Sequence, residues 1–119
     1  MNSDKYVVYV DDDPDDRSLF MEAFHSIPDY RVVTLVNGFE LMLFLKQRTR
    51  EEMPSLIVLD INMPVMNGID AARILRLRMP TVPIIMFTSY TSTFLEEEMR
   101  SAGVTEMVSK SDVFLLGTL

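Results

Sequence analysis

Five polar residues stand where short apolar runs of the sequence end, and their types suit the chemistry of phosphate and a divalent cation. They are Asp11, Asp12, Asp60, Thr88 and Lys110. Carboxylates packed together repel one another unless they take up protons or share a cation. Mg²⁺ prefers oxygen ligands, usually one or two carboxylates together with water and a phosphate oxygen. The three aspartates fit that description, and because the set lacks His and Cys it is poorly suited to zinc.

A carboxylate can also act as a nucleophile toward phosphorus and form an aspartyl phosphate. Phosphoryl transfer depends on positioning and on charge neutralisation more than on acid–base chemistry. Mg²⁺ and the Lys110 ammonium group would neutralise the phosphoryl oxygens, and the Thr88 hydroxyl would donate a hydrogen bond to one of them. The sequence has no glycine-rich phosphate loop, so it does not predict a nucleoside triphosphate site.

These residues can meet only if the apolar runs form one sheet. Runs at 6–10, 32–36, 56–59, 83–87 and 107–109 predict five buried strands, and helical patterns separate them. Strands that are apolar on both faces indicate a parallel sheet covered by helices on both sides. The sequence therefore predicts a doubly wound (βα)₅ α/β fold with a short last helix and the flavodoxin-like strand order 2-1-3-4-5. Ligands of such sheets bind at the carboxyl ends of the strands, where the five polar residues are expected.

The start of the first helix is marked by its residue types. Asp13 is the expected N-cap, with Pro14 at the first helical position and Pro28 as the stop. Asp15 and Asp16 would lie at the positive end of the helix dipole. The face expected to turn inward consists of Leu19, Phe20, Ala23, Phe24 and Ile27.

Two later helices have the spacing of a capping box at their start. Asn37 with Glu40 opens the second helix, and Thr93 with Glu96 is expected to open the fourth. Gly103 is the expected C′ residue of the fourth helix, because glycine adopts the left-handed conformation needed there.

Composition and charge narrow the function classes. The 119 residues carry a formal net charge of −7, and such a surface repels the phosphates of nucleic acid. There is no cysteine, which excludes a disulfide framework, and no apolar run approaches the ~20 residues of a membrane span. The expectation is one domain over residues 1–119 without an effector domain, located in the cytoplasm, with no direct contact to nucleic acid or membrane.

Four blocks of this sequence closely resemble the response regulator receiver family of two-component signal transduction, a CheY-like superfamily. They are Val-Asp-Asp-Asp-Pro at 10–14, Leu-Asp-Ile-Asn-Met-Pro-Val-Met-Asn-Gly at 59–68, Phe-Thr-Ser at 87–89 and Ser-Lys at 109–110. The resemblance extends from about Lys5 to Leu116. The segment Asp-x-x-Met-Pro-x-Met-x-Gly is its most specific part.

The resemblance implies a role for each site residue. Asp60 would be the phosphoacceptor, Thr88 the switch hydroxyl and Lys110 the lysine that contacts the phosphate. For Mg²⁺, the implied ligands are the side chains of Asp12 and Asp60, the backbone carbonyl of Asn62 and, mainly through water, Asp11.

The resemblance also implies partners. The phosphoryl group would come from a histidine kinase or a histidine phosphotransfer protein, and phosphorylation would switch the surface formed by the fourth helix, the last strand and the last helix. That surface would bind a downstream protein or a second copy of the chain. Catalysis would be limited to magnesium-dependent self-phosphorylation and autodephosphorylation, so no conventional enzyme is expected.

The sequence departs from the family pattern at two positions near the lysine. Ser111 stands where the family usually has proline, and Met107 stands where it usually has Tyr or Phe. The apolar tail at 113–116 follows, in a last helix that is shorter than usual.

Three other functions fit the sequence less well than the receiver. A pseudo-receiver would keep the fold without phosphorylation, but all five active-site side chains are present here. A haloacid-dehalogenase-like phosphatase would need a second aspartate two residues after the nucleophile, where this chain has Asn62. A flavodoxin would need a hydroxyl-rich phosphate loop after the first strand, where this loop is acidic.

Overall fold

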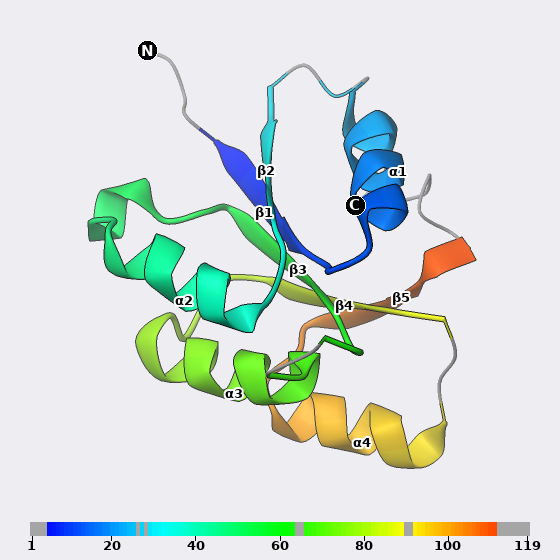
Figure 1. Ribbon diagram of the computed structural model, residues 1–119. Helices are drawn as coiled ribbons and strands as arrows, with labels where there is room; N and C mark the ends of the chain where they lie inside the picture. Colours follow the sequence, from blue (N-terminus) through cyan, green and yellow to red (C-terminus); the bar gives the residue numbers. More distant parts are fainter. Residues whose placement is uncertain (1–4, 26, 28, 64–65, 90–91, 112–119) are drawn as a thin grey trace.

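A computed structural model describes residues 5–25, 27, 29–63, 66–89 and 92–111. Its centre is a parallel sheet with the strand order β2-β1-β3-β4-β5, as Figure 1 shows. The strands are β1 (Tyr6–Val10), β2 (Arg31–Leu35), β3 (Leu56–Asp60), β4 (Ile84–Thr88) and β5 (Glu106–Ser109). The predicted fold class and strand order are confirmed. Each strand begins and ends within one residue of its predicted bounds.

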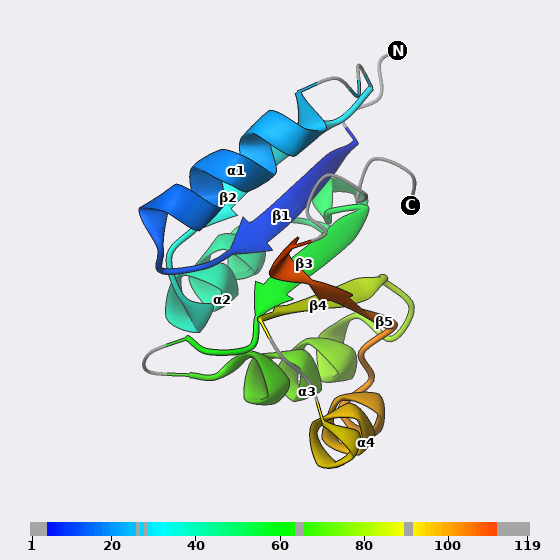
Figure 2. The ribbon, with the colours of Figure 1, turned by 90° about the vertical axis from the view of Figure 1, so that its right-hand side faces the viewer.

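Helices cover both faces of this sheet. They are α1 (Pro14–Phe24), α2 (Gly38–Lys46), α3 (Gly68–Arg78) and α4 (Thr93–Ser101), with a short 3₁₀ turn η1 at Arg50–Glu52. Figure 2 shows α1 on one face and α2, α3 and α4 on the other. The segment expected to form the short last helix lies outside the described residues. Within the described part of the chain, no helix combines the length and the apolar character needed to cross a membrane.

The sheet divides the apolar interior into two clusters. On the α1 side, Tyr9 stacks on Phe20 with ring centroids 4.2 Å apart, and Phe87 meets Tyr9 edge-on at 5.6 Å. On the other side, aliphatic and methionine side chains of β1, β3 and β4 pack against α2, α3 and α4. The central strands β1, β3 and β4 are buried on both faces, which explains their continuous apolar sequences, whereas the edge strands β2 and β5, also predicted to be buried, are only partly buried.

The inward face of α1 is narrower than predicted. Phe20, Ala23 and Phe24 are buried and Ile27 packs against the same cluster, but Leu19 is 45% exposed. The prediction for Leu19 is therefore wrong. Successive helical residues are about 100° apart, and Leu19 falls at the edge of the stripe that Phe20 and Phe24 centre on the sheet. Pro28 lies outside the described residues.

The caps agree with the sequence at three of the four predicted positions. Asp13 and Asn37 are the N-caps of α1 and α2, and Gly103 has a φ of 91° at the end of α4. The amide N–H of Gly103 donates to the carbonyl of Arg100, which is half of a Schellman motif. The amide N–H of Val104 donates to the carbonyl of Met99 and completes that motif.

The fourth predicted cap is wrong by one residue. Ser92, rather than Thr93, is the N-cap of α4, because Ser92 has extended backbone angles and its hydroxyl accepts from the Leu95 amide at 3.2 Å. Thr93 is already helical. Serine and threonine are both favourable N-cap residues, so the backbone conformation decides between these adjacent candidates.

Candidate functional site

The predicted site residues all lie at the carboxyl edge of the sheet. Asp60 is the last residue of β3 and Thr88 is the last residue of β4, whereas Lys110 directly follows β5. The parallel register pairs Asp60 with Phe87, so these strand ends are level with one another. Asp11 directly follows β1, which is the neighbour of β3 on its other side.

Three carboxylates form an acidic cluster there, made of Asp11, Asp12 and Asp60. Each offers an oxygen atom, and these atoms all lie within 4.8 Å of one another. Asp11 is fully buried and Asp60 is only 4% exposed, whereas Asp12 is exposed. An all-oxygen set with one side open to water fits a hard divalent cation that keeps several of its waters.

Lys110 joins the acidic cluster from the far end of the chain. Its Nζ atom lies 3.1 Å from Asp11 Oδ2 and 3.3 Å from Asp60 Oδ1. A third carboxylate, Asp16 of α1, is closer still at 2.7 Å. The ammonium group therefore bridges the phosphoacceptor candidate, a buried aspartate and the first turn of α1.

Asp11 is held by partners on both of its oxygens. Its Oδ1 accepts from the Asp13 amide at 3.0 Å, and its Oδ2 accepts from the Tyr9 hydroxyl at 2.5 Å as well as from Lys110. Arg17 donates to the Asp11 carbonyl at 2.8 Å and ties the loop to α1. Asp11 is thus a fixed negative charge beside Asp60.

Burial and neighbouring charge shift the proton affinities of the site. Burial raises the pKa of Asp60 to about 6, and the negative charge of Asp11 acts in the same direction, whereas Lys110 and a hydrogen bond from the Asn62 amide oppose it. Burial acts to lower the pKa of Lys110, but its hydrogen bonds to Asp16 and Asp11 outweigh that and raise it. Burial and Asp11 together therefore favour the protonated form of the Asp60 carboxyl.

Gly68 lets α3 begin directly against the end of β3. Its amide donates to the Ile61 carbonyl at 3.1 Å, and a Cβ atom at this position would lie 2.5 Å from the Asp60 carbonyl oxygen. Asn67 caps the helix by accepting from the Asp70 amide at 2.9 Å. The Asn-Gly pair that marks a loop in the sequence thus fixes the backbone of Asp60.

The sequence matches the response regulator receiver domain over residues 7–113. The chain belongs to this family. A relative, protein-glutamate methylesterase/protein-glutamine glutaminase 1 of Syntrophus aciditrophicus, is 33% identical over 109 residues, which are 90% of this chain and 30% of that protein. The probable transcriptional regulator ycf27 of Pyropia yezoensis is 38% identical over 74% of this chain and 34% of its own length. The receiver therefore spans about a third of these relatives.

Solved receiver structures share the fold. The chemotaxis protein CheY4 of Vibrio cholerae has a TM-score of 0.84 at 26% identity, with 98% of this chain and 97% of that chain covered. The Mn²⁺-bound form of the response regulator Rcp1 has a TM-score of 0.82 at 23% identity, covering 95% of this chain and 88% of that chain.

The two departures from the family pattern lie in β5 and in the turn that follows it. The Ser111 amide donates to Ser109 Oγ at 3.3 Å, and the two serine hydroxyls lie 2.8 Å apart, so side-chain hydrogen bonds shape the turn after β5. Met107 is partly buried against the aliphatic cluster on the α4 side of the sheet. Pro64 and the tail at 113–116 lie outside the described residues.

Two residues of the receiver site were missed in the sequence. Tyr9 reaches Asp11 because residues two apart in a strand point to the same side, and the tyrosine two positions before Asp11 was the available signal. Asp16 was interpreted only as a charge at the start of α1, and no local pattern relates it to Lys110, which is 94 positions away.

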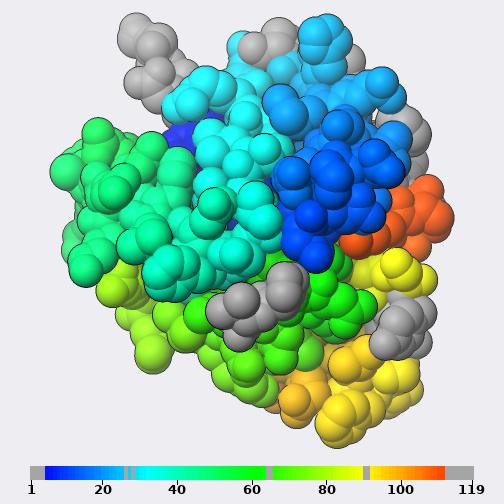
Figure 3. All heavy atoms as spheres, in the orientation of Figure 1, coloured from blue at the N-terminus to red at the C-terminus, as the bar shows by residue number. Residues whose placement is uncertain are grey.

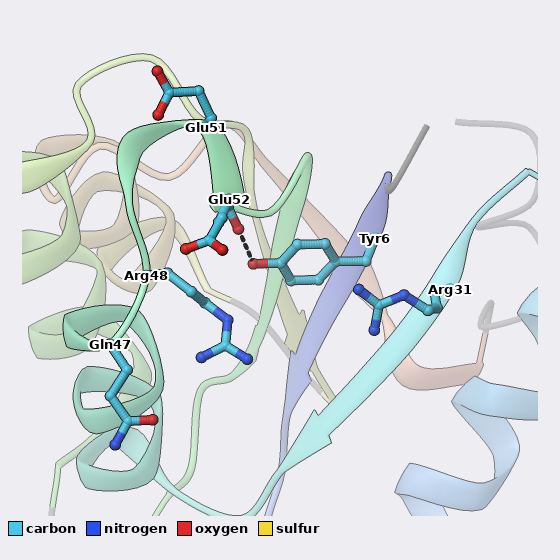
Figure 4. A pocket seen from close by; sticks show the side chains of 6 residues that line it. All are labelled: Tyr6, Arg31, Gln47, Arg48, Glu51 and Glu52. Carbon is cyan, nitrogen blue, oxygen red and sulfur yellow. Dashed lines mark hydrogen bonds between the residues drawn. The ribbon is translucent and has the colours of Figure 1, made fainter. Parts of the chain in front are cut away.

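A separate pocket of about 490 Å³ lies at the opposite end of the sheet (Figure 4), lined by Tyr6, Arg31, Gln47, Arg48, Glu51 and Glu52. The Arg48 guanidinium lies 3.5 Å from the Phe44 ring centroid, and the Tyr6 hydroxyl donates to the Glu52 carbonyl. Tyr6 and Arg31 are the first residues of β1 and β2, so this pocket is remote from the receiver site. It contains none of the predicted site residues.

Proposed function

We propose that this receiver accepts a phosphoryl group on Asp60 with Mg²⁺ bound beside it. The observation that carries the proposal is the convergence of a buried Asp60 with two further aspartates and Lys110 at one strand edge. A carboxylate oxygen of Asp60 would form the new bond to phosphorus as the bond between phosphorus and the donor's leaving group breaks. The donor would be a histidine kinase or a histidine phosphotransfer protein.

The surrounding residues have distinct roles in this proposal. Lys110 would hold a phosphoryl oxygen, and the Thr88 hydroxyl, at the end of β4, would donate to another. Mg²⁺ supplies further positive charge against the phosphoryl oxygens. Its ligands would be Asp12, Asp60 and the Asn62 carbonyl. Asp11, whose oxygens already accept protein hydrogen bonds, would act through water.

We propose that signalling uses the same site. Phosphorylation would draw Thr88 toward Asp60 and repack Met107, and so alter the surface of α4, β5 and the segment after them. We propose that this surface binds a downstream protein or a second copy of the chain, in the cytoplasm and without direct contact to nucleic acid.

Acetyl phosphate with Mg²⁺ should add one phosphoryl group to the protein, detected by intact mass. A chelator should prevent the addition, and Asp60→Asn should abolish it. The exposed Asp29, in the loop between α1 and β2, provides a matched control, because Asp29→Asn removes the same charge and should leave the reaction intact. Phosphoryl addition that persists in Asp60→Asn refutes the assignment, and none in the unaltered protein favours the pseudo-receiver.

Asp12 and Asp13 are neighbours with different expected effects on Mg²⁺ affinity. Asp12 belongs to the acidic cluster, whereas Asp13 Oδ1 accepts from the Asp15 amide at 2.8 Å and caps α1. Asp12→Ala should weaken Mg²⁺ binding by about tenfold or more, measured by calorimetry. Asp13→Ala should leave the affinity nearly unchanged but lower the free energy of unfolding by about 1 kcal/mol. Equal affinities in the two variants would contradict this division.

A further inference from the structure

Asp16 of α1 makes the shortest contact to the Lys110 ammonium group. The distance from Lys110 Nζ is 2.7 Å to Asp16, against 3.1 Å to Asp11 and 3.3 Å to Asp60. Figure 3 shows the end of β5 (orange-red) lying against the start of α1 (blue) at the surface. From this contact we infer that Asp16 is a positioning residue that competes with the phosphoryl group for Lys110. The inference rests on the proposed function.

The competition follows from the number of hydrogen bonds that lysine can make. An ammonium group has three N–H donors, and three carboxylates surround this one. Lys110 donates hydrogen bonds to Asp11 and Asp16, and its third donor faces Asp60, the proposed phosphoryl acceptor, at 3.3 Å. A phosphoryl oxygen that takes more than this third donor must therefore replace Asp11 or Asp16, or share a donor with one of them. Until that exchange occurs, part of the lysine's charge is neutralised by a group that takes no part in the reaction.

Burial indicates which carboxylate is displaced. Asp11 is fully buried and held by Tyr9 and Asp13, so removing Lys110 from it would leave a buried charge with one cationic partner fewer. The Asp16 side chain is 28% exposed, and water can solvate it when the ion pair opens. Because Asp60 itself carries the phosphoryl group, the choice lies between Asp11 and Asp16, and Asp16 is the partner that Lys110 exchanges for a phosphoryl oxygen.

The position of Asp16 is fixed by the start of α1. Asp13 caps the helix and Pro14 opens it, which places Asp16 in the first turn facing the sheet edge. Arg17 anchors the same turn to the Asp11 carbonyl. Asp15 lies in this turn too, but its side chain is exposed, so it shares the helix-dipole environment of Asp16 without the lysine contact.

The pair Asp16→Asn and Asp15→Asn separates contact from general charge. Each variant removes one negative charge from the first turn of α1. Asp16→Asn should bind beryllofluoride, a phosphoryl mimic, about threefold more tightly in the presence of Mg²⁺ and should react with acetyl phosphate faster by a similar factor. Asp15→Asn should change the beryllofluoride affinity and the rate with acetyl phosphate by less than about 1.5-fold, because solvent screens the charge of Asp15. Asp16→Glu should restore the original values.

A second measurement needs neither metal nor phosphate. In the metal-free protein, the NMR signal of the Lys110 ammonium group should exchange with water faster in Asp16→Asn than in Asp15→Asn or the unaltered protein. Equal lysine exchange in the two variants, or equal or weaker beryllofluoride binding in Asp16→Asn, overturns the role of Asp16. Absence of any phosphorylation in the unaltered protein instead overturns the proposed function. In that case the exchange of the Lys110 ammonium protons with water still tests whether Asp16 contacts Lys110.

Discussion

Asp60→Asn should stabilise the metal-free protein at neutral pH. The pKa of Asp60 is raised from 3.8 to about 6 by burial and by Asp11. The folded state therefore binds more protons than the unfolded state between these values, and stability falls as the pH rises from about 4 to about 6. Above pH 6 the cost is complete, at about 3 kcal/mol for a shift of this size. Asparagine has nearly the same shape and no charge to bury.

Urea unfolding in the presence of a chelator measures this effect. The free energy of unfolding of Asp60→Asn should exceed that of the unaltered protein at pH 7.5, and the difference should shrink toward zero near pH 4, where the carboxyl is protonated in the folded state. Mg²⁺ should stabilise the unaltered protein more than the variant. Asp29→Asn serves as the control for a simple change in net charge. If Asp60→Asn raises the free energy of unfolding equally at all pH values, or lowers it at pH 7.5, the buried charge of Asp60 is not costly.

Gly68→Ala should be among the most damaging single-methyl additions in this chain. The added Cβ would lie 2.5 Å from the Asp60 carbonyl oxygen and 3.0 Å from the Ile61 Cα, both backbone atoms that cannot rotate away. The start of α3 would have to move from the end of β3. Overpacking of this kind costs about 1–3 kcal/mol and occasionally more. Because Asp60 itself is displaced, Mg²⁺ affinity should also fall.

Gly38→Ala provides the matched comparison for the stability lost in Gly68→Ala. Gly38 is also the first residue of a helix, but its added Cβ would meet the Met66 side chain, with Sδ at 3.0 Å. A flexible methionine can adjust, so the free energy of unfolding should change by about 1 kcal/mol or less. Denaturant unfolding and calorimetric Mg²⁺ titration of both variants test the difference. Similar losses in the two variants would contradict the special role of the contact with Asp60.

Much of the architecture was accessible from the sequence because it depends on local patterns. Continuous apolar runs indicated the strands, and their alternation with helices indicated a parallel sheet in the observed order. Parallel strands end at one edge, so the position of Asp60, Thr88 and Lys110 after three of these runs was enough to bring them together. Asp13, Asn37 and Gly103 act within a few residues of themselves, and their roles were predicted correctly.

The remaining features depend on which surfaces meet in space. The exposure of Leu19 depends on the exact rotation of α1 over the sheet, and the cap at Ser92 depends on backbone angles. Neither is specified by residue type.

The electrostatics of the site were decided by tertiary structure alone. The raised pKa of Asp60 comes from burial and from Asp11, and the strongest partner of Lys110 is an aspartate 94 positions away. The sequence determined which charged groups stand at the ends of the strands, because strand ends follow from the local apolar runs. Only the folded chain determined which of these charges pair and how deeply each is buried. Desolvation and ion pairing depend on the distances between segments of the chain, and the sequence does not specify those distances.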